Sequence, residues 1–188
     1  MATITVSNGE IATVPVGQTD TGDIVQSGGT LDVFGSTSGT NVNSGGIILV
    51  ASGGTTTGTV TNGFEIINGG GFASNTTISS GGETIINGGR EIFSEILNGG
   101  QAIVQAGSAI ATSLQTGASE LITGNGVAIG NGDGGGVITV VSGGVASGTD
   151  ISTSCWCRLS VWSTASRSFA APTWRPSNIS TSSLRATM

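Results

Sequence analysis

The sequence predicts an all-β protein, namely a right-handed parallel β-solenoid (β-helix) of about eight coils of about 18 residues, followed by an irregular C-terminal tail. Three observations predict this fold. A β-branched residue or leucine recurs every 17–19 residues, a glycine follows each of them three positions later, and the segments between glycines are short and rich in Ile, Val and Thr. The recurring residues are Val6, Val25, Val42, Val60, Ile78, Ile96 and Leu114, and Ile151 lies two further coils on with one inserted residue.

Each coil is expected to contain short strands separated by glycine corners, with a looser third side. Segments of four to six residues that are rich in β-branched side chains suit pleated strands. The glycine density excludes α-helix, because each interior glycine costs roughly 1 kcal/mol relative to alanine. Pairs such as Gly81-Gly82 and Gly99-Gly100 supply the positive φ that a corner needs. Equivalent positions of successive coils then stack about 4.8 Å apart as parallel ladders.

The apolar spacing within one coil predicts which side chains fill the interior. In the clearest coil, apolar residues lie at the start, seven positions later and fourteen positions later, at Ile78, Ile85 and Ile92. We expect these side chains to stack in a narrow dry interior, and Thr84 to face solvent with the other Ser, Thr, Asn and Gln residues. Four phenylalanines are expected to pack inside or at corners rather than to form a sugar platform, and they are Phe34, Phe64, Phe72 and Phe93. The absence of tyrosine, and of tryptophan before residue 155, also argues against carbohydrate stacking.

Composition divides the chain into a repeat domain, 1–154, and an atypical tail, 155–188. All 34 glycines and all 11 acidic residues precede residue 151, where Arg90 is the one base, so the repeats carry a net charge of −10. The tail has four arginines, all three tryptophans and both cysteines. Such an abrupt change indicates either an out-of-frame reading of a continuing repeat or a natural tail that is disordered or caps the last coil. The sequence leaves both open, and we expect the tail to be dispensable for the fold.

Several function classes are disfavoured by composition. Phosphate contacts need clustered Lys or Arg, which the acidic repeats lack, so nucleic acid is not an expected partner. The chain has no histidine, the commonest general base and metal ligand. No apolar run is long enough for a membrane-spanning helix. The opening residues 1–6 lack the basic and apolar regions of a secretory signal peptide, so the sequence predicts no export route.

Two segments resemble fragments of metal sites. The segment 130–136 contains Asp133 among glycines and is similar to part of a calcium-binding nonapeptide, but one imperfect copy favours a glycine loop that absorbs the inserted residue. Cys155 and Cys157 lack the further ligands of a zinc site. We therefore predict no metal and no cofactor.

Two side-chain clusters point to other functions. Glu83, Glu91 and Glu95 could form a carboxylate cluster for glycoside cleavage, but coils without inserted loops leave no cleft, and solvated outer positions are expected. The threonines of 55–61 could suggest an ice-binding array, but they do not repeat in register. The sequence predicts no catalytic residue, and the chain is not expected to be an enzyme.

The repeats resemble the passenger-domain repeats of AIDA-type autotransporter adhesins. The strings that carry the resemblance are VNSGG at 42–46, SGGTTTGTV at 52–60, ISSGGE at 78–83 and VSGGVASGTDI at 141–151, and it covers roughly residues 6–151. The resemblance implies a bacterial cell-surface or secreted β-solenoid that acts in adhesion, biofilm formation or self-association. Some members carry glycans on Ser or Thr, which implies possible acceptors at Ser44, Ser80 and Ser142 beside the glycine pairs.

The predicted function is therefore non-enzymatic multivalent adhesion or self-association, with cell-surface or extracellular-matrix ligands as partners. The alternative is a passive stalk that displays a further C-terminal domain. This domain would be an outer-membrane barrel, as in the autotransporters, or a Hint-type domain, because similar repeats open bacterial proteins that carry one. Neither domain is predicted within this sequence. A polysaccharide-active β-helix enzyme ranks lowest.

Overall fold

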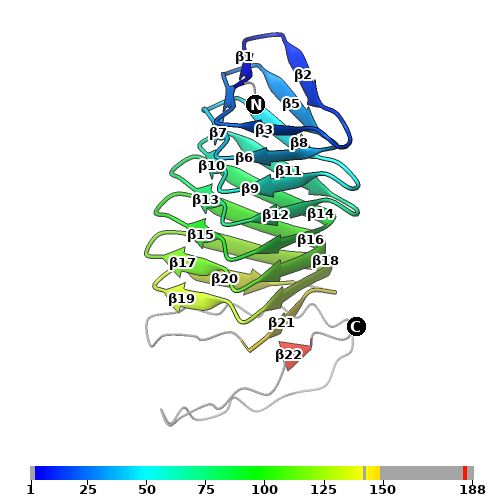
Figure 1. The fold of residues 1–188 in the computed structure, drawn as a ribbon. Coiled ribbons are helices and arrows are strands. Elements are labelled where there is room, and N and C mark those ends of the chain that lie inside the picture. The colour runs from blue at the N-terminus through cyan, green and yellow to red at the C-terminus, as the bar shows by residue number, and fades with distance from the viewer. Residues whose placement is uncertain (1–2, 142, 149–183, 186–188) are drawn as a thin grey trace, which may run out of the picture.

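The computed structural model describes residues 3–141, 143–148 and 184–185, and the first two of these ranges form parallel strands stacked in eight coils (Figure 1). These residues contain no helix, so none of the described chain could cross a membrane as a helix. The predicted all-β solenoid is confirmed. Each coil has three strands, so the stack has three faces, which we name the first, second and third face in chain order.

The first face is an eight-stranded parallel sheet of very short strands. Its strands are β1 (Thr5–Val6), β4 (Ile24–Val25), β7 (Asn41–Val42), β10 (Val60–Thr61), β13 (Thr77–Ile78), β15 (Glu95–Ile96), β17 (Ser113–Gln115) and β19 (Gly132–Gly134).

The second and third faces belong to one larger sheet. The second face consists of β2 (Ile11–Val14), β5 (Thr30–Val33), β8 (Ile47–Val50), β11 (Phe64–Asn68), the first parts of β14 (Glu83–Ile92), β16 (Gln101–Ile110) and β18 (Ser119–Ile129), and β20 (Val137–Val140). The third face consists of β3 (Thr19–Thr21), β6 (Ser36–Ser38), β9 (Thr55–Thr57), β12 (Phe72–Ser74), the last parts of β14, β16 and β18, and β21 (Val145–Ser147).

The third side of each coil is thus a regular strand and not the looser side that the sequence predicts. In β14, β16 and β18 the strand even continues through the corner between the second and third faces. The register shifts there, between Asn87 and Arg90 on β14 and between Val104 and Ala106 on β16. These bulges bend a long strand without ending its pairing.

The register of the fourth coil differs from the predicted spacing. Val42 pairs with Thr61, and Thr61 pairs with Ile78, so Thr61 and not Val60 occupies the inward position of the first face. Thr61 is fully buried, whereas Val60 is 37% exposed. The even spacing of 18 residues around Val60 is therefore wrong by one residue, and in a strand one residue exchanges the two faces.

Two stacks of mainly aliphatic side chains fill part of the interior. The first-face stack contains Val6, Val25, Val42, Thr61, Ile78, Ile96 and Leu114, and the second-face stack contains Val14, Val33, Val50, Ile67, Ile86, Val104 and Ile122. The predicted position of the second stack is wrong by one residue. Thr84 and Ile86 point inward with no exposed surface, and Ile85 between them lies on the outer side and is half-buried.

The glycine pairs satisfy two different requirements, as Gly99 and Gly100 illustrate. Gly99 has a φ of +78°, which L side chains rarely adopt. Gly100 has an ordinary φ, but a Cβ there would lie 2.6 Å from the carbonyl oxygen of Ile78 in the coil before. The first glycine of the pair therefore turns the chain, and the second lets two coils approach.

A second column of left-handed residues runs along the corner between the third and first faces. Its members are Gly22, Gly39, Gly58, Asn75, Phe93, Ala111, Gly130 and Gly148, with φ between +55° and +69°. Each of the first seven donates its N–H to a carbonyl of the following coil, as Phe93 does to Ile110 at 2.9 Å. Phe93 and Ala111 hold this geometry with a Cβ, at a cost of roughly 1–2 kcal/mol each.

The phenylalanines were expected inside or at corners. The expectation that they are buried inside is wrong for all four. Phe34, Phe64 and Phe93 are 41%, 40% and 61% exposed, and Phe72 is half-buried on the outer side of the third face. The interior is too narrow for rings at these positions, because the inward positions next to them are taken by Val33, Glu65 and Ser94.

The segment 130–136 is not only a loop. Its residues 132–134 form β19, in which Leu114 pairs with Asp133. The inserted residue lies earlier, in the bend of β18, because Val104 pairs with Ile122 whereas Ala106 pairs with Asn125, so the prediction that the segment absorbs it is wrong. Of the tail, only β22 (Leu184–Arg185) is described, and it pairs antiparallel with β21. The remaining expectations for 155–188, including those on Cys155 and Cys157, fall outside the described residues.

The corrected face assignment leads to a first prediction. Ile86→Ala should lower the free energy of unfolding by about 2–5 kcal/mol, because it opens a cavity in the second-face stack. Ile85→Ala should cost only about 1 kcal/mol, because that side chain already contacts water. Urea titration followed by circular dichroism measures both, and equal losses would contradict the assignment.

A second prediction concerns the left-handed column. Ala111→Gly should raise the free energy of unfolding by about 0.5–1 kcal/mol, because relief of the left-handed strain exceeds the entropy that glycine adds to the unfolded chain. The control Ala109→Gly, at a buried inward position of β16, should destabilise the protein. Loss of stability in Ala111→Gly would mean that the corner is unstrained.

Candidate functional site

A column of small polar side chains fills the interior beside the third face. From the second coil onward, one such residue lies two positions before the inward residue of the first-face strand, and the main-chain carbonyls of the first six accept a hydrogen bond from the following coil. The members are Asp23, Thr40, Thr59, Thr76, Ser94, Thr112 and Asn131, and all are buried. Many threonines that were expected to face solvent therefore face inward.

At both ends of this polar column, the side chain accepts hydrogen bonds from neighbouring groups. The Ile4 N–H donates to Asp23 Oδ1 at 2.9 Å, and Thr37 Oγ1 donates to Asp23 Oδ2 at 2.8 Å. At the other end the Thr112 N–H donates to Asn131 Oδ1 at 3.1 Å. Between them, the hydroxyl oxygens of Thr59, Thr76, Ser94 and Thr112 have no hydrogen-bond partner among the described residues.

Three carboxyl groups lie inside the same half of the interior. Glu65 accepts a hydrogen bond from Thr56 Oγ1 at 3.0 Å, and Glu120 accepts one from Asn131 Nδ2 at 2.7 Å. Glu91 lies in a stack between Ala73 and Ala109, whose small side chains leave room for it, and the Ser94 hydroxyl is its polar neighbour. All three side chains are at most 1% exposed.

Burial controls the charge of these carboxyl groups. Burial, and then the nearby Glu65, raise the pKa of Glu91 to about 8, although the Ser94 hydroxyl opposes part of this change. Burial also raises the pKa of Glu120 to about 7, against the hydrogen bond from Asn131, and raises the pKa of Glu65. At neutral pH Glu91 is thus mainly protonated, which an interior without cations requires.

The carboxylate cluster considered from the sequence does not form. Glu91 is inside the solenoid, so the expectation that it is solvated on an outer face is wrong. Glu83 lies on the second face and Glu95 on the first, where Glu95 accepts a hydrogen bond from Gln115 Nε2 at 2.7 Å. A fully buried carboxyl cannot contact a polysaccharide, so Glu91 is unsuited to glycoside cleavage.

Two of the three candidate glycan acceptors lie at one corner. Ser44 and Ser80 are exposed at the corner after the first face, in the third and fifth coils, so about 10 Å of stack separates them. Ser142 lies outside the described residues. Both described hydroxyls are therefore accessible from solvent.

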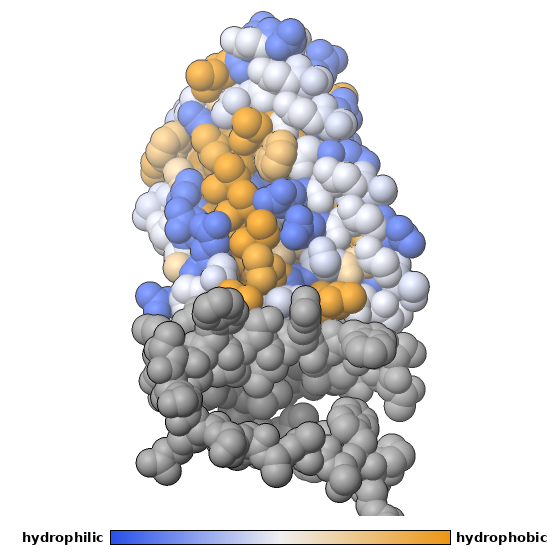
Figure 2. Space-filling model, turned by 180° about the vertical axis from the view of Figure 1, so that it is seen from behind, coloured by the Kyte–Doolittle hydropathy of each residue, from blue (hydrophilic) through white to orange (hydrophobic). Residues whose placement is uncertain are grey.

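An unbroken row of aliphatic side chains runs along the outer side of the second face. Its members pair in register from coil to coil, and Figure 2 shows the row as an orange column between polar rows. We name it the aliphatic ladder, and it consists of Leu49, Ile66, Ile85, Ile103 and Leu121, all half-buried. The sequence signal for it is the run of consecutive apolar residues in each strand, because one of two neighbours must face outward.

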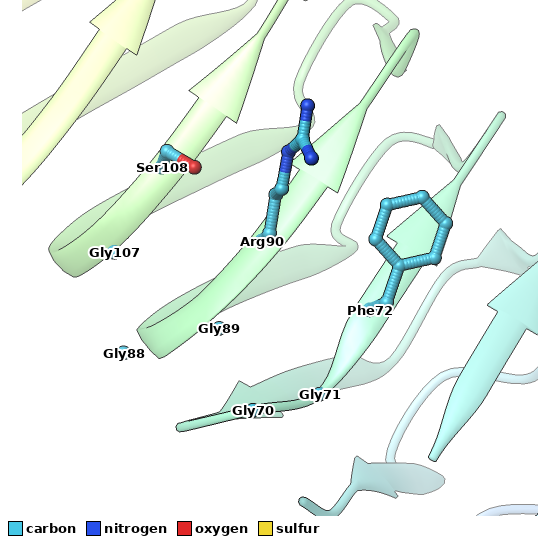
Figure 3. Close-up of a pocket in the computed structure, with 8 residues that line it drawn as sticks. All are labelled: Gly70, Gly71, Phe72, Gly88, Gly89, Arg90, Gly107 and Ser108. Carbon is cyan, nitrogen blue, oxygen red and sulfur yellow. The ribbon is translucent and has the colours of Figure 1, made fainter. Parts of the chain in front are cut away.

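The outer side of the third face holds a shallow hollow of about 410 Å³ in the fourth to sixth coils. Phe72, Arg90 and Ser108 pair in register and project from it in the same direction (Figure 3). Glycines form its floor at the corner where β14 and β16 bend, and they are Gly70, Gly71, Gly88, Gly89 and Gly107. The sequence analysis did not identify this hollow, because its residues lie 18 positions apart.

Metal ligands do not gather in the part of the chain that the structure describes, where no three His, Cys, Asp or Glu side chains come together. The threonines of 55–61 are divided between faces. Thr55 and Thr57 point outward on the third face, whereas Thr56, Thr59 and Thr61 are buried.

The buried carboxyl groups lead to a third prediction. The unfolded chain releases the Glu91 proton near pH 4.5, and the folded protein holds it to about pH 8. Between these values the folded state binds more protons, so the free energy of unfolding falls as the pH rises. We expect the thermal midpoint of the wild type to be highest near pH 4.5 and to fall by several degrees on going to pH 8.

Glu91→Gln isolates this contribution. The variant should melt with a weaker dependence on pH and should be more stable than the wild type at pH 8. Glu83→Gln, on the outer side of the same strand, is the matched control and should keep the wild-type slope. Identical slopes in the wild type and Glu91→Gln would show that Glu91 does not titrate between these values.

No family model and no curated protein matches the chain. Among solved structures, the chain is similar to the crystal structure of a TibC-catalysed hyper-glycosylated TibA55-350 fragment, with 19% sequence identity and a TM-score of 0.46. The match covers 85% of this chain and 92% of that chain. A similarity this distant does not assign a family, and the resemblance of the repeats to adhesin passengers remains a prediction.

Proposed function

We propose that the chain is a non-enzymatic repeat module of a bacterial surface or secreted protein, and that it makes multivalent contacts, including contacts with further copies of itself. The single observation that carries this proposal is the aliphatic ladder on the second face. It repeats one kind of contact in five successive coils at steps of about 4.8 Å, which suits an interaction in which many weak sites add.

The dimensions of the aliphatic ladder favour a second copy of this chain as its partner. Five rows at this spacing extend over roughly 20 Å. Exposed apolar patches of several hundred Å² commonly mark interaction sites. A straight row of this kind is self-complementary, because two copies can lay their ladders against each other as two packed sheets do, about 10 Å apart.

Charge also permits this contact. The repeats are acidic, with a net charge of −10, so two copies repel each other in general. On the outer side of the second-face strands, Asp32 and Glu83 are the only charged side chains among the described residues. Two acidic side chains along the whole face add little repulsion where the apolar contact is largest.

We further propose that Ser44 and Ser80 are glycan acceptors, which is supported by their exposure on one corner. Glycans there would project from the edge between the first and second faces and leave the aliphatic ladder uncovered. The alternative function is a passive stalk that displays a further domain. No feature of the described structure specifically favours this alternative.

A bead assay tests the proposed function as a fourth prediction. Beads coated with the full chain should clump, and the variant Ile66→Thr/Ile85→Thr/Ile103→Thr should clump about tenfold less, because each row of the ladder contributes. Threonine keeps the β-propensity of these strands. The matched control Ser36→Ala/Thr55→Ala/Ser108→Ala, on the outer side of the third face, should clump like the wild type.

Two outcomes would contradict the proposal. Wild-type beads that stay dispersed at every density would argue against adhesive self-contact. Clumping that is lost in the control set and retained in the threonine variant would assign the contact to the hydroxyl rows of the third face. Circular dichroism of each variant verifies that the solenoid is intact.

A further inference from the structure

The outer side of the third face changes character along the stack. In the first three coils its outward positions are Ser or Thr, as in Ser36, Ser38, Thr55 and Thr57. From the fourth coil onward, aromatic, basic and aliphatic residues appear at equivalent positions, namely Phe72, Arg90, Ile92, Ile110, Val127 and Ile129, beside the hydroxyl residues Ser74, Ser108 and Ser147. Phe72 and Arg90 have no hydroxyl counterpart in their own coils at this position, so the outer surface differs there from that of the first three coils.

The glycine floor of the hollow brings a ligand close to the main chain. Gly70 and Gly88 are exposed at this bend and have no side chains that would keep a ligand from the backbone. Phe72 and Arg90 stand beside this floor on neighbouring strands, about 4.8 Å apart at their backbones, and Ser108 follows on the next strand (Figure 3). A ring, a guanidinium fork and a hydroxyl thus border one patch of bare backbone.

The positive charge of Arg90 favours an anionic ligand in this hollow. Arg90 is the only basic residue of residues 1–154, its side chain is exposed, and no described residue pairs with its guanidinium. The outward positions of the third-face strands contain no Asp or Glu among the described residues. An unpaired guanidinium prefers a carboxylate, which it binds through two parallel hydrogen bonds.

The shape of the hollow selects a sugar and not a peptide. A pyranose ring presents a flat C–H face that packs on an aromatic ring, and the hollow is open enough for such a ring to lie against Phe72. An extended peptide would need a free strand edge to pair with. Here β12, β14 and β16 are each paired on both sides, so no edge is open.

We propose that the hollow of Phe72, Arg90 and Ser108 binds a carboxylate-bearing sugar ring, such as a hexuronate unit of an acidic polysaccharide. Arg90 holds the carboxylate, the ring packs on Phe72, and the sugar hydroxyls reach Ser108 and the glycine backbone. This site does not depend on the self-contact of the aliphatic ladder, which lies on a different face.

A solution titration tests this site as a fifth prediction. The full chain is titrated with trigalacturonate, and with the neutral galactose trimer of the same linkage, in about 0.15 M salt, which screens the acidic body beyond about 8 Å. Amide resonances of the floor glycines should shift with trigalacturonate. Arg90→Gln should weaken its binding about tenfold and remove the preference over the neutral trimer. Phe72→Ser, which restores the hydroxyl of the earlier coils, should weaken binding of both trimers.

Phe64→Ser is the matched control, because Phe64 is a similarly placed ring on the second face, and it should leave binding unchanged. The proposal is overturned if the floor glycines do not respond to trigalacturonate, if the neutral trimer binds equally well, or if Arg90→Gln binds like the wild type. It is also overturned if a triglutamate peptide binds as tightly, since charge alone would then suffice. None of these outcomes affects the bead assay, so the two proposals fail separately.

Discussion

The backbone hydrogen bonds between successive coils are the constraint on which the rest of the structure depends. They join each coil to the next in register on all three faces, as in Ile24 N–H to the Ile4 carbonyl at 2.9 Å and Asn41 N–H to the Asp23 carbonyl at 2.8 Å. Each residue is therefore stacked on its equivalent about 4.8 Å away. Differences in coil length have to be absorbed at corners, because a slip within a strand would exchange its two faces.

The backbone hydrogen bonds between coils explain why buried polar side chains are tolerated in part of the interior. The coil path fixes one inward position two residues before each first-face core residue, whatever side chain occupies it. Small hydroxyl and carboxamide groups fit there, and Glu91 fills the space that Ala73 and Ala109 leave on the neighbouring coils. Burial raises the pKa of Glu65, Glu91 and Glu120, so the stability of the stack depends on proton binding.

The 18-residue period and the glycine corners could be predicted from the sequence. Which side chains of each strand face the interior could not. Recurring residues such as Val42 and Ile78 identify the inward position of their coils, because polar residues flank each of them before the corner glycine. In the second-face strands, by contrast, Ile85 and Ile86 are adjacent and equally apolar. Period-2 alternation requires one of them to face outward, but composition does not tell which.

Polar residues that face inward make it harder to predict which side of a strand is buried. Thr84 and Thr61 read as surface residues because threonine is usually exposed, yet the interior accepts them. The aliphatic ladder was missed for the same reason, since its members read as core. The hollow at Phe72 and Arg90 could not be recognised without the register, because its residues come from different coils and share no local motif.

The direction of the hydrogen bonds between coils has a mechanical consequence. They run along the axis of the stack, as the bonds from Gly28 to the Gly45 carbonyl and from Gly53 to the Gly70 carbonyl do. A pull applied along this axis loads the few bonds of a terminal coil first and peels the coils off one at a time. Resistance to stretching is then set by a single coil, and a longer stack dissipates more work without becoming stronger.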